Sequence, residues 1–193
     1  MTQPLAGLIA DLTAQLSPVV DETLPLDPQT KVLVRAYVVL AHAEFENHVE
    51  TLCTARAQAI RTAAAGGVCH PGLIALVLRY ADDIKGQRVS PGDVAKVAAT
   101  AAGLYGGLVR ANNGIKRSDL EALIAPLGVT ADALAADAGE FADAAEALAA
   151  LRGPAAHVGD AGFEHDVYPS NARDAVKLVL SRLAAFEALL ALP

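Results

Sequence analysis

The chain has few of the residues that characterise several large classes of protein. Of its 193 residues, two are cysteine, none is tryptophan and only 4% are aromatic. Cys53 and Cys69 are not part of closely spaced cysteine pairs, which argues against a disulfide framework and against a zinc site. Lysine and arginine together number 15 against 22 acidic residues, so the formal net charge is −7. This balance disfavours a protein that coats nucleic acid, although a nuclease with a small basic patch remains compatible with it.

Targeting, membrane and cofactor signals are scarce as well. The segment Met1–Pro4 lacks the basic and apolar regions of a signal peptide. The apolar stretch Val32–Ala41 contains Arg35 and runs directly into glutamates, so it is too short to cross a bilayer. The sequence motifs of common ATP, dinucleotide and zinc-protease sites do not occur. We therefore expect a cytoplasmic protein with no membrane association, no cofactor and no metal.

Alanine and leucine supply most of the 53% hydrophobic content, which favours close-packed helices. Apolar residues recur at helical spacing between proline, glycine and capping signals. In the first half of the chain, the pattern predicts helices over 5–16, from Pro28 to about Ala65, and from Pro71 onward. A further helix is expected to begin at the cap Ser90–Pro91 and to run past Leu104, and another follows a Ser118–Glu121 capping box. The last two predicted helices run from Thr130 to Leu151 and over 170–192, the latter from a cap at Ser170. We find no strand pattern, repeat or linker. The expected fold is an all-α bundle of six to eight helices in one domain, 1–193.

Arg152 and His157 stand close together near the end of the long alanine-rich helix pattern. Arginine is always cationic and fits a phosphate, whereas histidine transfers protons near neutral pH. Pro154 disfavours helical geometry at Gly153, so the helix is expected to be interrupted here; if Gly153 is an N-cap, Pro154 is the first residue of a new helix and His157 the fourth. Such a turn would direct free N–H groups outward, which favours an anion. The alternative is a helix end with two solvated side chains.

A second arginine and histidine, Arg35 and His42, show that this spacing also arises by chance. They lie two turns apart on a helix that no proline or glycine interrupts, which separates them by about 10 Å. That distance is large for joint contact with one phosphate. We interpret this pair as a polar strip on a core helix.

Three segments together resemble a known family. Leu151–Gly159 is similar to the Arg-x4–6-His signature of the HEPN superfamily. Arg35–Glu46 resembles the long helix with an "EFE" core of its RiboL-PSP branch, and Asn113–Leu120 resembles the "NGIK" segment of that branch. The three segments occur in the expected order, and the resemblance covers residues 28–159.

The resemblance implies an all-α homodimer and a metal-independent endoribonuclease that acts as a toxin or in antiviral defence, with an antitoxin or defence protein as a possible partner. In the corresponding mechanism, Arg152 neutralises charge on the phosphorane and His157 is the general base or acid. Attack by the ribose 2′-hydroxyl restricts cleavage to RNA. Supporting residues are Glu44, Asn47, Lys116 and Arg117.

Each supporting residue also has a purely structural interpretation. Glu44 either orients the Arg/His motif or forms an ordinary ion pair. Asn47 shares its helix, where polar residues alternate with apolar ones. Lys116 and Arg117 form a small basic patch that contacts an RNA backbone or simply faces solvent.

The chain departs from the family at Gly153, where asparagine, aspartate or histidine usually follows the arginine. The loss of that polar side chain favours an alternative function, a catalytically weak module that binds RNA, a nucleotide or a protein. A structural helical bundle with a coincidental Arg/His spacing is the third interpretation.

Overall fold

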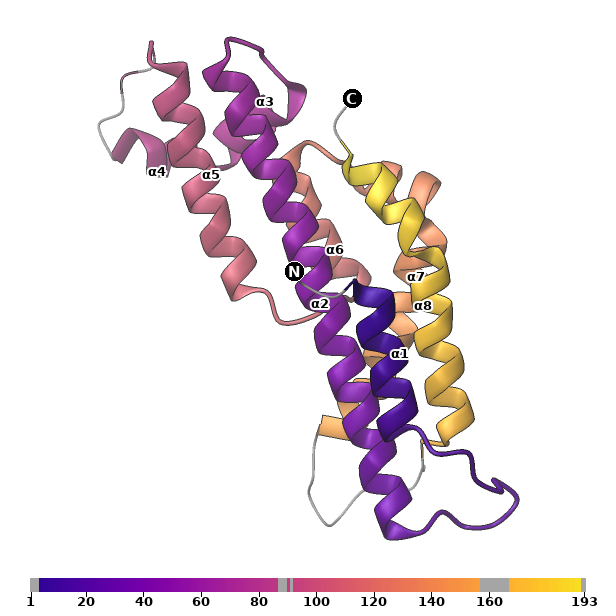
Figure 1. Ribbon diagram of the computed structural model, residues 1–193. Helices are drawn as coiled ribbons and strands as arrows, with labels where there is room; N and C mark the ends of the chain where they lie inside the picture. Colours follow the sequence, from indigo (N-terminus) through magenta and orange to yellow (C-terminus); the bar gives the residue numbers. More distant parts are fainter. Residues whose placement is uncertain (1–3, 87–89, 91, 157–166, 192–193) are drawn as a thin grey trace.

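The computed structural model describes residues 4–86, 90, 92–156 and 167–191, and within 154–156 only the backbone. These residues form helices and no strands, which confirms the predicted all-α class. The elements are α1 (Leu5–Leu16), α2 (Pro28–Ala65), α3 (Pro71–Arg79), α4 (Ala81–Gly86), α5 (Val94–Ala111), α6 (Arg117–Ile124), the 3₁₀-helix η1 (Ala125–Leu127), α7 (Ala131–Ala156) and α8 (Pro169–Leu190) (Figure 1).

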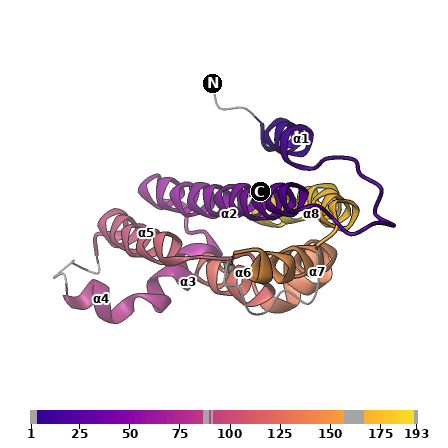
Figure 2. The ribbon, with the colours of Figure 1, turned by 90° about the horizontal axis from the view of Figure 1, so that it is seen from below.

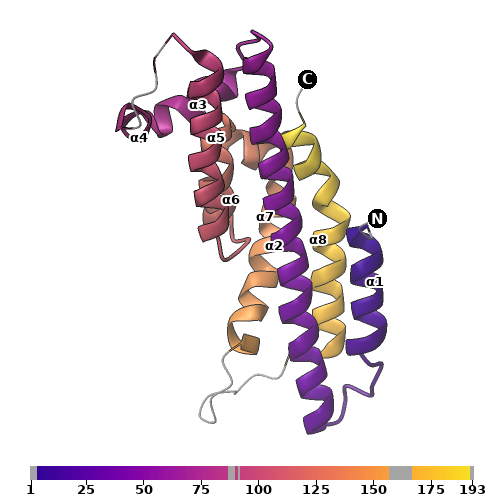
Figure 3. The same ribbon diagram turned by 60° about the vertical axis from the view of Figure 1, so that its left-hand side comes forward.

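Helix α2 is the central element of the bundle. It contacts α1, α5, α7 and α8 (Figure 3). The predicted N-cap is confirmed, because the Asp27 carboxylate accepts the backbone N–H groups of Gln29 at 2.9 Å and Thr30 at 3.0 Å. Pro28 then occupies the first helical position, where its missing N–H costs nothing.

The helices form layers on both sides of α2 and α8. Seen from below, α1 covers one side of these two helices, whereas α5, α6 and α7 lie on the other (Figure 2). The strongest packing joins α7 to α8, where the Phe141 and Phe186 rings stack with centroids 4.9 Å apart. Both rings are fully buried. This layering brings the C-terminal half of α7 against the middle of α2, where the candidate site lies.

Helix α7 does not end where the sequence predicted. It continues through Gly153 and Pro154 to Ala156, so Gly153 is not an N-cap. Pro154 falls in the last turn, where its missing N–H removes one helical hydrogen bond but few residues follow that need to continue the helix. The non-helical backbone lies instead at Ala138, with φ −139° and ψ 24°. The expected outward-facing N–H groups at Gly153 are therefore absent from this helix.

Two further caps differ from the prediction. Helix α6 begins at Arg117, because the Asp119 carboxylate accepts the Lys116 N–H at 3.1 Å, and Ser118 is the second helical residue rather than the cap. Helix α5 is capped by Asp93, which accepts the N–H of Lys96 at 3.0 Å, rather than by the predicted Ser90–Pro91. In contrast, the Thr130 hydroxyl accepts the Ala133 N–H at 3.1 Å at the start of α7, as expected.

The start of α8 is held from a distant part of the chain. Ser170, the predicted cap, is the second helical residue after Tyr168 and Pro169. Its N–H donates to the Glu22 carboxylate at 2.8 Å, and its hydroxyl donates to the other oxygen of the same carboxylate. The loop between α1 and α2 thereby anchors the N-terminus of α8.

This anchor makes folding sensitive to acid. Hydrogen bonds from Ser170 lower the pKa of Glu22, and hydrogen bonds from Thr30 lower that of Asp27. A carboxyl whose pKa is lower in the folded state stabilises the fold above its unfolded pKa, and this contribution disappears as the pH falls through the folded pKa. We expect the urea midpoint to fall between pH 5 and pH 3, and to fall less for Glu22→Gln. The measurement is urea denaturation followed by circular dichroism at each pH. If the urea midpoints of wild type and Glu22→Gln changed equally with pH, Glu22 would not be a source of this acid sensitivity.

Among the described helices, none has both the length and the apolar character that a bilayer crossing requires.

Candidate functional site

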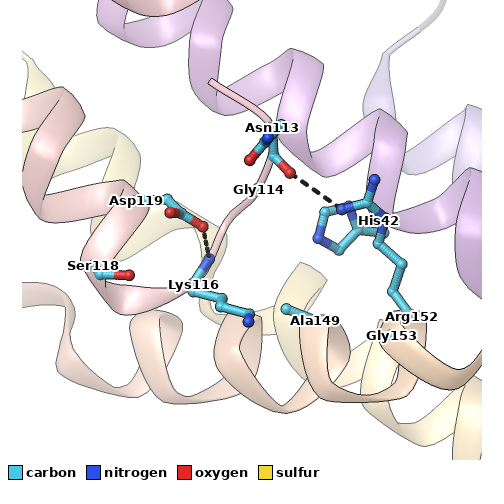
Figure 4. A pocket seen from close by; sticks show the side chains of 9 residues that line it. All are labelled: His42, Asn113, Gly114, Lys116, Ser118, Asp119, Ala149, Arg152 and Gly153. Carbon is cyan, nitrogen blue, oxygen red and sulfur yellow. Dashed lines mark hydrogen bonds between the residues drawn. The ribbon is translucent and has the colours of Figure 1, made fainter. Parts of the chain in front are cut away.

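A cavity of about 500 Å³ lies between α2, α7 and the loop that leads into α6 (Figure 4). Its volume falls within the range of small-molecule sites. Its walls come from three separate parts of the chain. The lining residues are His42, Asn113, Gly114, Lys116, Ser118, Asp119, Ala149, Arg152 and Gly153.

Arg152 extends from the last turns of α7 along one wall of the cavity. Its guanidinium donates to the Asn113 carbonyl at 3.1 Å, a neutral acceptor. Within the described part of the chain, no carboxylate lies within ion-pair distance of this guanidinium. The half-buried cation therefore retains donors for an anionic ligand.

The loop opposite Arg152 is held in place from both sides. The Asn112 side chain donates to Glu50 of α2 at 2.9 Å and to the Gly114 carbonyl at 3.0 Å. Gly114 is buried, and a Cβ built on it would overlap the Asp119 carboxylate. Only glycine allows this close approach, which keeps Asp119 bound to the Lys116 N–H. The predicted turn is thus a fixed wall of the cavity.

Lys116 supplies a second cation on the same side as this loop. Its side chain is exposed and reaches across the cavity toward Ala149 of α7 (Figure 4). Asp119 also lines the cavity, but its carboxylate is engaged in capping α6. Two cationic side chains therefore face a common space in a chain of net charge −7.

His42 of α2 lies beside the Arg152 guanidinium in the wall of the cavity (Figure 4). The side chain is only 1% exposed, and its Nδ1 is 3.7 Å from the Glu46 carboxylate. Burial, followed by the positive charge of Arg152, lowers the pKa of His42 to about 4. The imidazole is therefore neutral at neutral pH. Burial also raises the pKa of Glu46, an effect that Arg152 partly offsets.

The structure brings together some of the predicted residues and separates others. Arg152 and Lys116 share the cavity. Glu44 and Asn47 do not line it, because a rotation of about 100° per residue places them about 200° and 140° around α2 from His42. Their predicted support of the Arg/His motif has no counterpart in the wall of this cavity.

Of the remaining predicted site residues, Arg117 lies in contact with α7 and His157 is not described by the structure. The Arg117 guanidinium donates to Asp143 at 2.7 Å, and the backbone N–H of the same residue donates to Glu146 at 2.8 Å. These contacts join α6 to α7, and Arg117 does not line the cavity. His157 follows Arg152 by five positions and lies outside the described residues.

Sequence reasoning missed His42 as a site residue. In the sequence, His42 forms a pair with Arg35, two turns away on the same helix. In the folded chain, the arginine beside His42 is Arg152 of α7. The available signal was a histidine at a core position, between the buried residues Ala41 and Phe45. Buried titratable groups in cavities are candidates for function.

Among the described residues, no three histidine, cysteine, aspartate or glutamate side chains gather closely enough to hold a metal ion.

Comparisons of the chain with models of protein families, with curated proteins and with solved structures found no match.

Proposed function

We propose that this protein is a metal-independent endoribonuclease of the HEPN type, with the cavity between α2, α7 and the α6 loop as its phosphodiester-binding site. The observation that supports the proposal most is the placement of Arg152 and Lys116 around one cavity that also contains His42. A phosphodiester carries one negative charge, and two cations from different elements match it better than a solvated basic surface does.

The chemistry follows from these groups and from the Arg/His motif. The ribose 2′-oxygen attacks phosphorus as its proton is removed, the bond to the 5′-oxygen breaks, and that oxygen takes a proton. Arg152 stabilises the negative charge that builds up on the phosphoryl oxygens. His157 is proposed as a proton-transfer residue. The products are a 2′,3′-cyclic phosphate and a 5′-hydroxyl, and no metal is needed.

The proposal extends to the biological setting. The substrate is RNA, the active form is a homodimer, and the activity serves as a toxin or in antiviral defence, with an antitoxin or defence protein as partner. A cytoplasmic location belongs to the same proposal, since RNA and such partners are present there.

Gly153 supports a second candidate function. A Cβ built at this position meets no atom of the described residues within 4 Å, so among these residues nothing occupies the space where a polar side chain would stand. A site without that group binds RNA or a nucleotide but cleaves it slowly or not at all. In this alternative the protein is a binding module.

The test is an RNA cleavage assay with purified protein in the presence of EDTA. We expect wild type to produce fragments with 2′,3′-cyclic phosphate ends and to leave DNA of the same sequence intact. We expect His157→Ala to lose this activity. His48→Ala is the matched control, because His48 binds Glu187 at 2.9 Å on the surface of α2 and α8. Calorimetric binding of RNA without cleavage would instead support the binding module.

A further inference from the structure

His42 lines the cavity and has an unused polar atom in its buried imidazole ring. Its Nε2 is enclosed and has no hydrogen-bond partner among the described residues. A buried polar group without a partner is costly, and native proteins rarely keep one without a reason. The residue also lies against Arg152 rather than in the apolar core alone (Figure 4). Because Nε2 is enclosed, a ligand in the cavity becomes the missing partner once the groups that cover this atom move aside.

The neighbours of His42 determine which ring nitrogen carries the hydrogen. Nδ1 is 3.7 Å from the Glu46 carboxylate, which attracts an N–H group. A neutral imidazole has one N–H, so placing it on Nδ1 leaves a lone pair on Nε2. Nε2 is then a hydrogen-bond and proton acceptor. Glu46 therefore acts on the ring through its charge, since 3.7 Å is longer than the hydrogen bond by which a carboxylate orients a catalytic histidine.

We propose that His42 is the general base of this cavity and that its Nε2 accepts the proton of the ribose 2′-hydroxyl of a phosphodiester bound by Arg152 and Lys116. This inference rests on the proposed ribonuclease function. The 2′-hydroxyl proton moves to Nε2, the 2′-oxygen forms its bond to phosphorus, and the bond from phosphorus to the 5′-oxygen breaks. The 5′-oxygen takes a proton from a general acid or from water, so the reaction needs no other reactant.

The charged groups around the imidazole make its basicity depend on the ligand. Glu46 faces it from α2, Arg152 from α7, and Lys116 and Asp119 line the same cavity from the start of α6. Without a ligand, burial and, to a smaller extent, the positive charge of Arg152 oppose protonation of His42. A bound phosphodiester neutralises this guanidinium, so the affinity of His42 for a proton rises when the substrate is in place. The base is therefore unprotonated before binding and better able to accept a proton afterwards.

The first experiment compares His42→Gln with wild type in single-turnover cleavage of a short RNA. Glutamine fills much of the same volume and accepts a hydrogen bond but does not take up a proton. We expect the cleavage rate to fall by about 10²- to 10⁴-fold, the usual effect of losing a general base. Binding of the same RNA with 2′-O-methyl riboses should change less than about threefold. The acidic limb of the wild-type pH–rate profile should be absent from the variant.

His48→Gln is the matched control, since it makes the same change on the same helix away from the cavity. It should cleave like wild type. A wild-type rate for His42→Gln, or an equal loss of rate and of binding, would overturn the inference while leaving the ribonuclease function in place. A wild type that cleaves no RNA would overturn both.

A second measurement does not depend on activity or on the folding of a variant. ¹⁵N spectra of wild type with labelled histidine, recorded near pH 7, report which ring nitrogen of His42 carries the hydrogen. We expect the hydrogen on Nδ1 and an unprotonated Nε2, whose resonance shifts when 2′-O-methyl RNA binds. A hydrogen on Nε2, or no shift on binding, would rule out the proposed base.

Discussion

Arg152→Ala is expected to lower the rate of RNA cleavage by about 10³-fold. The Arg152 guanidinium lines the cavity and donates to one neutral carbonyl, that of Asn113, at 3.1 Å. Its remaining N–H groups have no partner among the residues that the structure describes, which leaves them for the phosphoryl oxygens, where negative charge grows in the transition state. Losing one charged donor of this kind usually costs two to three orders of magnitude or more in rate. The measurement is the single-turnover rate on a short RNA with saturating enzyme.

Two variants separate the effect of this site from a general effect of charge. Arg152→Lys keeps the charge but loses the planar fork, so we expect a smaller loss of rate. Arg182→Ala removes an arginine from α8 whose guanidinium pairs with Glu140 at 3.0 Å outside the cavity, and it should cleave like wild type. Thermal melts of each variant check that the fold persists without the contact to Asn113. Cleavage by Arg152→Ala at the wild-type rate would exclude this arginine from the site.

Phe186→Ala is expected to lower the free energy of unfolding by about 3–5 kcal/mol, the usual cost of truncating a buried phenylalanine. Phe186 and Phe141 are both fully buried and stack at 4.9 Å between α8 and α7. The change removes the ring and leaves a cavity at the strongest helix contact of the bundle. Because domains have a total stability of about 5–15 kcal/mol, this loss is a large fraction of it.

Urea denaturation followed by circular dichroism measures this effect. Phe186→Leu keeps most of the side-chain volume and should cost less than the alanine variant. Val19→Ala is the surface control, because Val19 is 90% exposed and surface changes usually alter stability by less than about 0.5 kcal/mol. If Phe186→Ala were as stable as Val19→Ala, the stacked pair would not hold α7 against α8.

The central helix, whose start depends on residues close together in sequence, was predicted well, whereas the caps of α5 and α6 were not. The Asp27 cap with Pro28 and the uninterrupted run to Ala65 follow from hydrogen bonds and apolar spacing within a few residues. The prediction that Ser170 caps α8 was wrong, because the hydroxyl and the N–H of Ser170 bind Glu22, which lies 148 positions away in the sequence. A local pattern identifies Ser170 as a good capping residue but does not reveal a competing partner.

In the candidate site, too, the chemistry of single residues could be predicted from the sequence, but the direction of their side chains could not. Arg152 could be proposed from its chemistry and from its place in a motif. Lys116 and Arg117 are adjacent in sequence, yet one lines the cavity and the other binds Asp143 and Glu146 of α7. No local pattern distinguishes them, because the direction of each side chain depends on where α6 begins and on which helix packs against it.

The sequence alone established the helical class and the limits of the central helix, and it proposed one arginine that lines the cavity. These depend on backbone hydrogen bonds and apolar periodicity, which act over about four residues. The packing of α7 against α2 placed His42 beside Arg152 and closed a cavity with the loop around Asn113. Contacts between residues 42, 113 and 152 arise only when the helices bury their apolar faces together, so this grouping became visible only in the folded chain.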